Sequence, residues 1–345
     1  MSRLWSPGGT GRGWHRSGVA ERDPWDAAVK ALDGSVLQSW AWGEWYWHGG
    51  FTIERVRVDG PHGTGLAQLL VWPHDSVAQA YLPRGPVLSA NRVAVARALF
   101  TTVDEVCERY RPLTLTVEPP ASLTGTEKAT RFARGEERWC CPSRTMVVPL
   151  VDDESLLRRM RKKTRQQVRR SERRGIRVEQ VIPNDASLMT FYGLLEETAR
   201  RTEFDIEPLS YYESFMRHLA DEAVLLFART EAGVAAVLIM TCFGHEAIAH
   251  FSASSTKLRE PGTTAYLYFE AMRLARAHGC TRFDLWGLPD EDPPPVEGGQ
   301  PRGSRGGDWR GLYHFKMGLG GDVVASPPTL ECRYPVRRWL PWRRN

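Results

Sequence analysis

The segment from residue 283 to residue 321 organises this 345-residue sequence. It begins with FDLWG (283–287) and ends with GLYHFKMGLGG (311–321). The first five residues read as a short strand. Between the two ends, eleven of the 23 residues from Pro289 to Gly311 are Pro or Gly, and a loop this long in a compact domain is either functional or without regular structure. Lys316 follows this loop, so it is either a solvated lysine after a connection or a functional one.

Length and composition indicate a globular protein with about two domains. Hydrophobic residues make up 42% and charged residues 25% of the chain. We find no apolar run of about 18 residues and no apolar signal-peptide core, so we expect no membrane-spanning helix. The six cysteines lack C-x-x-C spacing, which argues against a zinc site and fits a reducing cytoplasm. We expect neither a metal nor a cofactor.

Positive charge is concentrated in one predicted helix. Residues 156–177 hold eleven Lys or Arg and one acid, a balance of +10, whereas the whole chain carries +5 and the remainder therefore −5. Asp152 and the following acids predict the start of this helix near Ser155, and Gly175 predicts its end after Arg174. Such a local charge indicates an anionic partner.

Hydrophobic patterning predicts an α/β fold with two similar halves. From about Ile176 the expected order is a strand, two helices, three antiparallel strands, a helix and a strand, which resembles the N-acetyltransferase (GNAT) fold. The first half shows a shorter version. We therefore predict two GNAT-like domains with mixed, largely antiparallel sheets flanked by helices. The predicted boundaries are a flexible tail (1–22), a first domain (23–149 with 322–345) and a second domain (150–321).

Short motifs spread over residues 37–321 together resemble the FemABX family of aminoacyl-tRNA-dependent peptidyltransferases, which build the interpeptide bridges of peptidoglycan. No single motif is specific, and their common order carries the resemblance. They are LQS and WGE (37–39 and 42–44), LPRGPV (82–87), LTVEP (115–119), the basic segment 156–178, PLSYY (208–212), FSASS (251–255), FDLWG (283–287) and FK (315–316).

The resemblance implies transfer of an aminoacyl group from aminoacyl-tRNA to a peptide amine of a peptidoglycan precursor. In the family, the acceptor lies between two GNAT-like domains and a Phe-Lys pair lies near the acyl donor. This implies catalytic roles for Phe315 and Lys316, and the Pro/Gly loop becomes a candidate lid over the aminoacyl end. The residues that the resemblance, or a position at a strand end, suggests for the acceptor are Tyr46, Arg84, Glu118, Glu207, Tyr211, Asp284 and Trp286.

Two positions depart from the family pattern. Tyr46 and Glu207 stand where relatives often carry cations that contact the phosphates of the acceptor. The acceptor could therefore be nucleotide-linked, lipid-linked or outside the murein precursors.

The chemistry needs an oxyanion stabiliser and a proton acceptor. Lys316 suits the first task because its ammonium is a compact charge on a flexible stem. Glu118 and Asp284 are candidates for the second, although either could instead cap a turn and substrate groups could relay the proton.

Basic and aromatic segments suggest further partners. The basic helix could bind tRNA phosphates or be a solvated face. The aromatic run Trp40–Trp47 reads as core or cleft wall more than as a base-stacking platform. The basic, aromatic C-terminus (337–344) is either a disordered tail or a contact with an anionic inner-membrane surface. The residues proposed for tRNA are Arg161, Lys162, Lys163, Arg165 and Arg169.

Two other functions remain open from the sequence. An acyl-CoA-dependent N-acyltransferase would use the turn at 259–264, but Pro261 removes one N–H donor there. A non-catalytic RNA-binding protein would not require the Phe315–Lys316 context.

Overall fold

The computed structural model describes residues 22–89, 92–121, 132–135, 141–258, 260–292 and 309–335. The predicted tail, most of the Pro/Gly loop and the basic C-terminal segment therefore lie outside the described residues. Contacts divide the chain into two units: residues up to 141 with those from 327 onward form unit 1, and residues 142–326 form unit 2. Each unit is described by itself.

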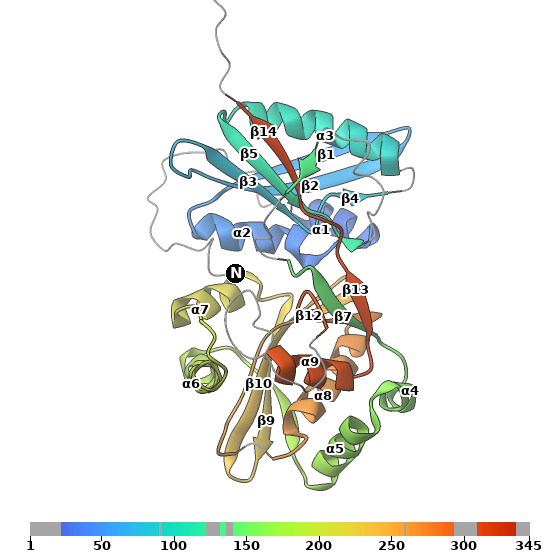
Figure 1. Ribbon diagram of the computed structural model, residues 1–345, viewed down its shortest axis with the longest axis vertical. Helices are drawn as coiled ribbons and strands as arrows, with labels where there is room; N and C mark the ends of the chain where they lie inside the picture. Colours follow the sequence, from blue (N-terminus) through green and yellow to red (C-terminus); the bar gives the residue numbers. More distant parts are fainter. Residues whose placement is uncertain are drawn as a thin grey trace, which may run out of the picture. The chain divides into compact units, whose positions relative to one another are not determined.

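Unit 1 is a mixed sheet with helices on both faces (Figure 1). Its strand order is β1-β2-β3-β5-β14-β6, with β4 paired to β2. All described pairs are antiparallel except β3 with β5. Its elements are α1 (Arg22–Ala31), η2 (Val36–Gln38), α2 (Trp40–His48), β1 (Thr52–Gly60), β2 (Gly63–Trp72), β3 (Ala78–Pro83), β4 (Val87–Leu88), α3 (Arg92–Glu108), β5 (Leu113–Glu118), β6 (Ala133–Arg134) and β14 (Leu330–Tyr334).

The LQS motif is structural in unit 1. The buried Gln38 side chain accepts from the N–H of Gln68 (2.8 Å) and donates to the carbonyl of Pro83 (2.7 Å), so it joins η2 to β2 and β3. Ser39 caps α2 by accepting from the N–H of Trp42 at 3.2 Å. These bonds satisfy buried backbone groups that the sheet leaves open.

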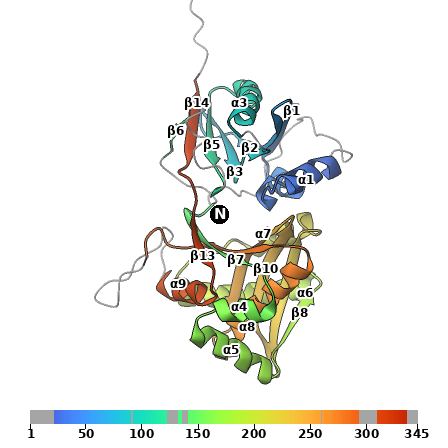
Figure 2. The same ribbon diagram turned by 90° about the vertical axis from the view of Figure 1, so that its right-hand side faces the viewer.

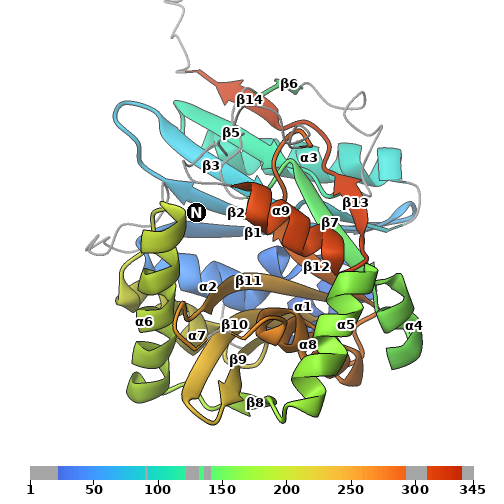
Figure 3. The same ribbon diagram turned by 60° about the horizontal axis from the view of Figure 1, so that its bottom comes forward.

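Unit 2 is a second mixed sheet, of order β13-β7-β12-β11-β10-β9-β8. The pair β11–β12 is parallel and the others are antiparallel. Figure 3 shows α6 and α7 on one side of this sheet and α8 on the other. Its elements are β7 (Arg144–Pro149), α4 (Asp153–Arg159), α5 (Lys162–Arg173), β8 (Arg177–Val181), α6 (Asp185–Thr202), α7 (Leu209–His218), β9 (Ala223–Thr230), β10 (Gly233–Phe243), β11 (Glu246–Ser254), α8 (Thr263–Ala277), β12 (Arg282–Gly287), α9 (Trp309–Gly318) and β13 (Asp322–Ala325).

The two-sheet α/β architecture confirms the predicted fold class. The unit boundary differs in detail from the predicted one. Strand β7 and strand β13 were assigned by sequence to the first domain, but β7 pairs with β12 and β13, so both belong to the second sheet. Pairing across more than a hundred residues leaves no mark in local periodicity.

The basic helix is not continuous, and this prediction was wrong. Helix α4 ends at Arg159, the backbone of Met160 and Arg161 is extended, and α5 begins at Lys162. The buried Met160 and the bond from the N–H of Arg161 to the carbonyl of Gly318 (3.0 Å) hold this break. Tertiary packing therefore overrides the helix propensity of the segment. Figures 2 and 3 show α5 packed outside α8.

Candidate functional site

Lys316 is a buried cation on helix α9. Its side chain is 5% exposed, and its Nζ donates to the carbonyls of Trp286 (3.0 Å) and Gly287 (2.6 Å) at the end of β12. An ammonium has three N–H groups, and two of them are used by these bonds. Phe315, next to it, packs edge-on against Tyr268 at 5.2 Å between ring centres. The helix is thus anchored on the core beside its lysine.

The carbonyls that hold Lys316 come from an irregular strand end. The pairing of β12 with β7 shifts register between Asp284 and Gly287, and Trp286 has a φ of 60°. Left-handed backbone is unfavourable for a tryptophan, so other contacts must stabilise it. The buried Asp284 carboxylate accepts from the N–H of Trp286 (2.7 Å) and from the hydroxyl of Thr145 on β7.

Burial lowers the pKa of Lys316 from its ordinary value of 10.5 to about 7, and the nearby negative charge of Asp284 opposes this shift. The amine therefore changes charge near neutral pH. A lysine whose pKa is displaced in this way, next to a carboxylate and two oriented carbonyls, is a candidate functional group with a physical cause.

The parallel strands β11 and β12 separate beside this lysine. They pair only from Glu246–Ile248 to Arg282–Asp284, and each then continues past the paired residues. His250 is the extra residue of a bulge between β10 and β11, and its ring lies 5.7 Å from that of Trp286. Its Nε2 lies 2.9 Å from the hydroxyl of the buried Thr241. Diverging strand ends of this kind are where α/β sheets admit ligands.

The predicted residues of PLSYY lie behind this opening as an aromatic wall. Tyr211 is 1% exposed, and its ring meets those of Tyr212 (5.3 Å) and Phe251 (6.1 Å). Glu207 lies in the connection before α7, where its N–H donates to the Tyr212 hydroxyl at 3.3 Å. The ring of His250 lies 5.9 Å from that of Phe251 and 5.7 Å from that of Trp286, so His250 joins this wall to Trp286. The structure therefore brings Tyr211, Asp284, Trp286 and Lys316 together in unit 2.

The other predicted acceptor residues lie in unit 1. Glu118 is fully buried, and one carboxylate oxygen accepts from the Tyr81 hydroxyl and from the N–H of Cys141 at 2.8 Å. Arg84 follows Pro83, which pairs with Glu118 in the β3–β5 ladder, and has a φ of 43°. Through these two hydrogen bonds, Glu118 ties Cys141 to the end of the unit 1 sheet.

Tyr46 belongs to the core of unit 1. It is 3% exposed and packs against Trp42, Trp45 and Phe51 with ring distances of 5.9, 4.9 and 5.1 Å. These rings are core side chains, the reading that the sequence favoured for this aromatic run. Such burial leaves Tyr46 little surface for an acceptor.

Helix α5 presents most of the predicted tRNA-binding cations to solvent. Arg161, Lys162, Lys163 and Arg169 are exposed. Arg165 is half-buried, and its Nη1 donates to the carbonyls of Leu157 and Arg158, both at 3.4 Å, so it closes the end of α4.

Sequence reasoning missed Thr145, Thr241 and His250. Each lies inside a segment predicted as a strand, but the partners of each are distant in sequence. The bulge that frees His250 and the register shift beside Asp284 depend on strand pairing, which a single sequence does not display. Among the described residues, no three His, Cys, Asp or Glu side chains form a metal-ligand group.

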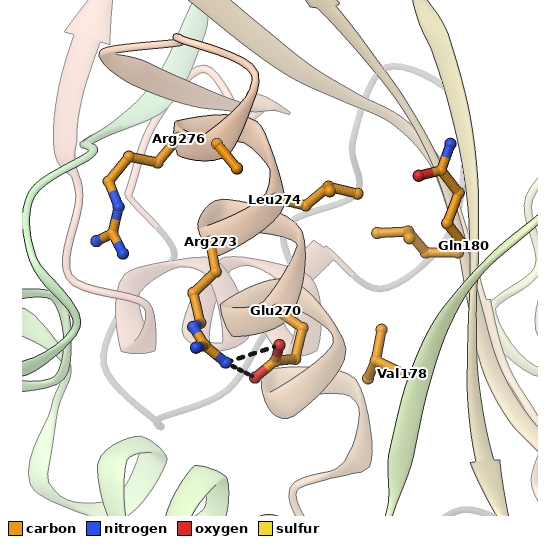
Figure 4. A pocket seen from close by; sticks show the side chains of 8 residues that line it. Val178, Gln180, Glu270, Arg273, Leu274 and Arg276 are labelled. Atoms are coloured by element: carbon orange, nitrogen blue, oxygen red, sulfur yellow. Dashed lines mark hydrogen bonds and ion pairs between the residues drawn. The ribbon is translucent and has the colours of Figure 1, made fainter.

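A separate groove lies between α8 and the edge strand β8. Its volume is about 470 Å³, and Figure 4 shows Leu274 of α8 facing Gln180 across it, with Arg273 paired to Glu270 on the helix. The groove is lined by none of the residues that hold Lys316. It is therefore distinct from the lysine site.

The sequence and the fold of the chain are similar to those of known transferases. The Acetyltransferase (GNAT) domain family matches residues 158–293, which lie in unit 2. Lipid II:glycine glycyltransferase of Staphylococcus aureus is 27% identical over 215 residues, covering 57% of this chain and 50% of the relative. The crystal structure of FemX superposes with a TM-score of 0.80 at 19% identity, covering 93% of this chain and 97% of FemX.

The chain is thus similar to FemABX proteins in sequence and in fold. The resemblance stated from its motifs is thereby confirmed. The chain spans about half the length of the curated relatives that it matches. A putative lysylphosphatidylglycerol synthetase domain from Agrobacterium fabrum shares the fold more distantly, with a TM-score of 0.54 at 13% identity over 90% of this chain and 91% of that one.

The helices of the described ranges include none with the length and hydropathy needed to cross a bilayer.

Proposed function

We propose that this protein transfers an aminoacyl group from aminoacyl-tRNA to a peptide amine of a peptidoglycan precursor, as part of interpeptide bridge formation. The observation that carries the proposal is Lys316, a buried amine held by two backbone carbonyls at the end of β12, beyond the point where β11 and β12 stop pairing. The curated relatives named lipid II:glycine glycyltransferase support the acceptor class.

The proposed role of Lys316 is to stabilise the oxyanion formed when the amine attacks the aminoacyl ester. The ester carbonyl carbon gains a bond to nitrogen, its oxygen becomes negative, and the ribose oxygen of the tRNA then leaves. One well-placed donor in a water-poor site is worth on the order of 3 to 4 kcal/mol in such a step. The third N–H of the Lys316 ammonium can supply that donor without losing the two carbonyl bonds.

The two predicted proton acceptors do not suit that task. Asp284 already accepts two hydrogen bonds around Trp286, and Glu118 accepts two at the end of the unit 1 sheet. An acceptor amine with an ordinary pKa near ~10.4 costs about 4 to 5 kcal/mol to deprotonate at pH 7. We therefore assign the proton to a substrate group or solvent, since both carboxylates are engaged in these structural contacts.

The proposed tRNA contact is the exposed side of α5. Its start is joined directly to the helix of Lys316: the N–H of Arg161 donates to the carbonyl of Gly318 (3.0 Å), and a Cβ on Gly318 would lie 2.5 Å from the Thr164 hydroxyl. Phosphates bound along α5 would thus be held by an element fixed to the catalytic helix. Phosphate contact by Lys and Arg supplies affinity without sequence preference.

The start of α8 favours an ester donor over acyl-CoA. Acyl-CoA enzymes of this fold bind the diphosphate on free N–H groups at this helix start. Here the N–H and hydroxyl of Thr263 both donate to the carbonyl of Glu260 (3.1 and 3.0 Å). A Cβ on Gly262 would lie 2.7 Å from the carbonyl oxygen of Gln167, so α5 packs closely on this turn.

The proposed acceptor is lipid-linked. Tyr46 is a core residue and Glu207 is acidic, so neither offers the cation that family members use for acceptor phosphates. A lipid-linked precursor on the inner face of the cytoplasmic membrane would be reached by a cytoplasmic protein through peripheral contact with that surface.

Donor and acceptor are tested together by incubating the purified protein with charged tRNA or acetyl-CoA and with lipid-linked or nucleotide-linked precursor. The proposal predicts that the aminoacyl group moves from tRNA to the lipid-linked precursor, detected by mass spectrometry. Consumption of acetyl-CoA in preference to charged tRNA would replace the proposal with the acyl-CoA alternative.

A further inference from the structure

The position of the Lys316 amine depends on an irregular backbone turn at the end of β12. Strand β12 has two residues, Leu285 and Trp286, between the ladder positions Asp284 and Gly287, which pair with Val147 and Thr145 of β7. This irregularity rotates the carbonyls of Trp286 and Gly287 onto Lys316. Regular strand backbone would instead direct successive carbonyls to opposite neighbours in the sheet.

The conformation at Trp286 is unfavourable in isolation. Its φ of 60° lies in the left-handed region, where a residue with a Cβ is rare and a bulky one is exceptional. An aspartate two residues earlier can stabilise such a turn by accepting the N–H of the residue in question. Asp284 does this at 2.7 Å.

The carboxylate of Asp284 is itself held in place. It is 1% exposed and accepts from the hydroxyl of Thr145, which is 4% exposed on the paired strand. The same Thr145 is the ladder partner of Gly287, one of the two residues whose carbonyl binds Lys316. Side chain and backbone therefore constrain one turn from both strands.

We propose that Asp284, fixed by Thr145, is a positioning residue that holds Trp286 in the left-handed conformation and so keeps two carbonyls aimed at Lys316. This role rests on the proposed function of Lys316 and replaces the acceptor-binding or proton-accepting role expected from sequence. Asp284 contacts the reaction through Lys316 and not through the substrate.

The arrangement has an electrostatic consequence. The negative charge of Asp284 raises the pKa of Lys316 against the effect of burial. Removing that charge, or turning the carbonyls away, would both lower the pKa of Lys316 below about 7. A larger share of the enzyme would then carry a neutral amine at neutral pH.

The first test follows the charge of Lys316 directly. The sequence contains six lysines, so the ¹³Cε spectrum of lysine-labelled protein is simple, and Lys316→Met assigns the resonance. Wild type should titrate near pH 7 and Asp284→Asn at a lower pH. A matched control, Glu179→Gln, removes an exposed carboxylate of β8 and should leave the midpoint unchanged. An equal midpoint in wild type and Asp284→Asn would overturn the proposal.

The second test separates positioning from general stability. Asp284→Asn should lower kcat by roughly 10² with little change in KM, the loss expected for a misplaced catalytic group. Because glycine adopts positive φ without a penalty, the same substitution should cost less in a Trp286→Gly background. Equal costs in both backgrounds would contradict the role assigned to the turn.

A third variant guards against failure of Asp284→Asn to fold. Thr145→Val keeps the charge of Asp284 and the shape of the side chain but removes the hydroxyl. It should lower kcat in the same direction by a smaller factor, and a wild-type kcat would count against the proposal. The titration needs no substrate, so a shifted midpoint without transfer from tRNA would refute the proposed function alone. Transfer with an unshifted midpoint would refute the positioning role alone.

Discussion

At the scale of single residues, the role of each buried charged group depends on the groups that it contacts. Lys316 and Glu118 were both selected from sequence, and both are almost fully buried. Lys316 donates to the backbone carbonyls of Trp286 and Gly287, whereas Glu118 accepts from the Tyr81 hydroxyl and the Cys141 N–H. Residue type and motif order point to both groups as candidates, but the sequence does not show the partners on which their roles depend.

Lys316 should make stability depend on pH. Its folded pKa of about 7 lies below the unfolded value of 10.5, so between these values the unfolded chain binds more protons and stability rises with pH. From pH 7 to pH 9 the wild type should gain roughly 2 to 3 kcal/mol relative to Lys316→Met, at about 1.4 kcal/mol per unit. Urea unfolding of both proteins at the two pH values measures this. A difference that stays constant would show that Lys316 has an ordinary pKa.

Glu118 should act on stability and not on chemistry. Glu118→Ala removes the acceptor of the Tyr81 hydroxyl and of the Cys141 N–H, which should cost about 2 to 4 kcal/mol in unfolding free energy. Glu118→Gln keeps an acceptor oxygen and serves as the matched control. Chemical denaturation gives the cost, and transfer assays at low temperature give the turnover. If Glu118→Gln folds normally but loses transfer, the carboxylate charge takes part in the reaction.

At the scale of elements, tertiary packing determines features that local sequence patterns do not predict. The acids at 152–154 and Gly175 correctly bracketed the basic segment, but its interruption at Met160 and Arg161 was not predictable. The interruption exists because the turn after α9 packs there: a Cβ on Gly320 would collide with the carbonyl of Arg159. Helix α9 itself was unexpected, since the sequence before Lys316 reads as loop.

Helix α5 should account for much of the salt dependence of tRNA binding. The triple variant Lys162→Gln, Lys163→Gln, Arg169→Gln removes three exposed cations. The slope of log K against log salt should fall by about 2 to 3, at roughly 0.7 to 0.9 per phosphate contact. Arg200→Gln, Arg217→Gln, Lys257→Gln is a matched control on other elements of unit 2. Filter binding at several salt concentrations measures the slopes of both variants. Equal slopes would show that α5 is a solvated face without phosphate contacts.

At the scale of the whole molecule, two mixed, largely antiparallel sheets were predictable from alternating patterns and helix signals. The long-range pairs were not. Strand β14 joins β5 from more than two hundred residues away, and β13 joins β7, because register depends on which faces are buried and not on nearby sequence. The second half was read more accurately since its strands are longer and more apolar.

Each unit has its own hydrophobic core, so damage to one should be local. Leu99 is fully buried in the core of unit 1, and Leu99→Ala should cost about 2 to 5 kcal/mol there. Hydrogen exchange should accelerate in β1, β2, β3 and β5 while β9 to β12 keep wild-type protection. The Lys316 titration should also be unchanged. Equal acceleration in both sheets would show that the units unfold as one.

The most direct measurement of the central claim is single-turnover transfer from charged tRNA to a lipid-linked precursor by wild type and by Lys316→Met. Methionine has an unbranched side chain one atom shorter than that of lysine and carries no charge, and circular dichroism confirms that the variant is folded. The account predicts that the variant transfers at least about 10²-fold more slowly, the loss expected for one oxyanion donor. A folded Lys316→Met protein that transfers at the wild-type rate would contradict it.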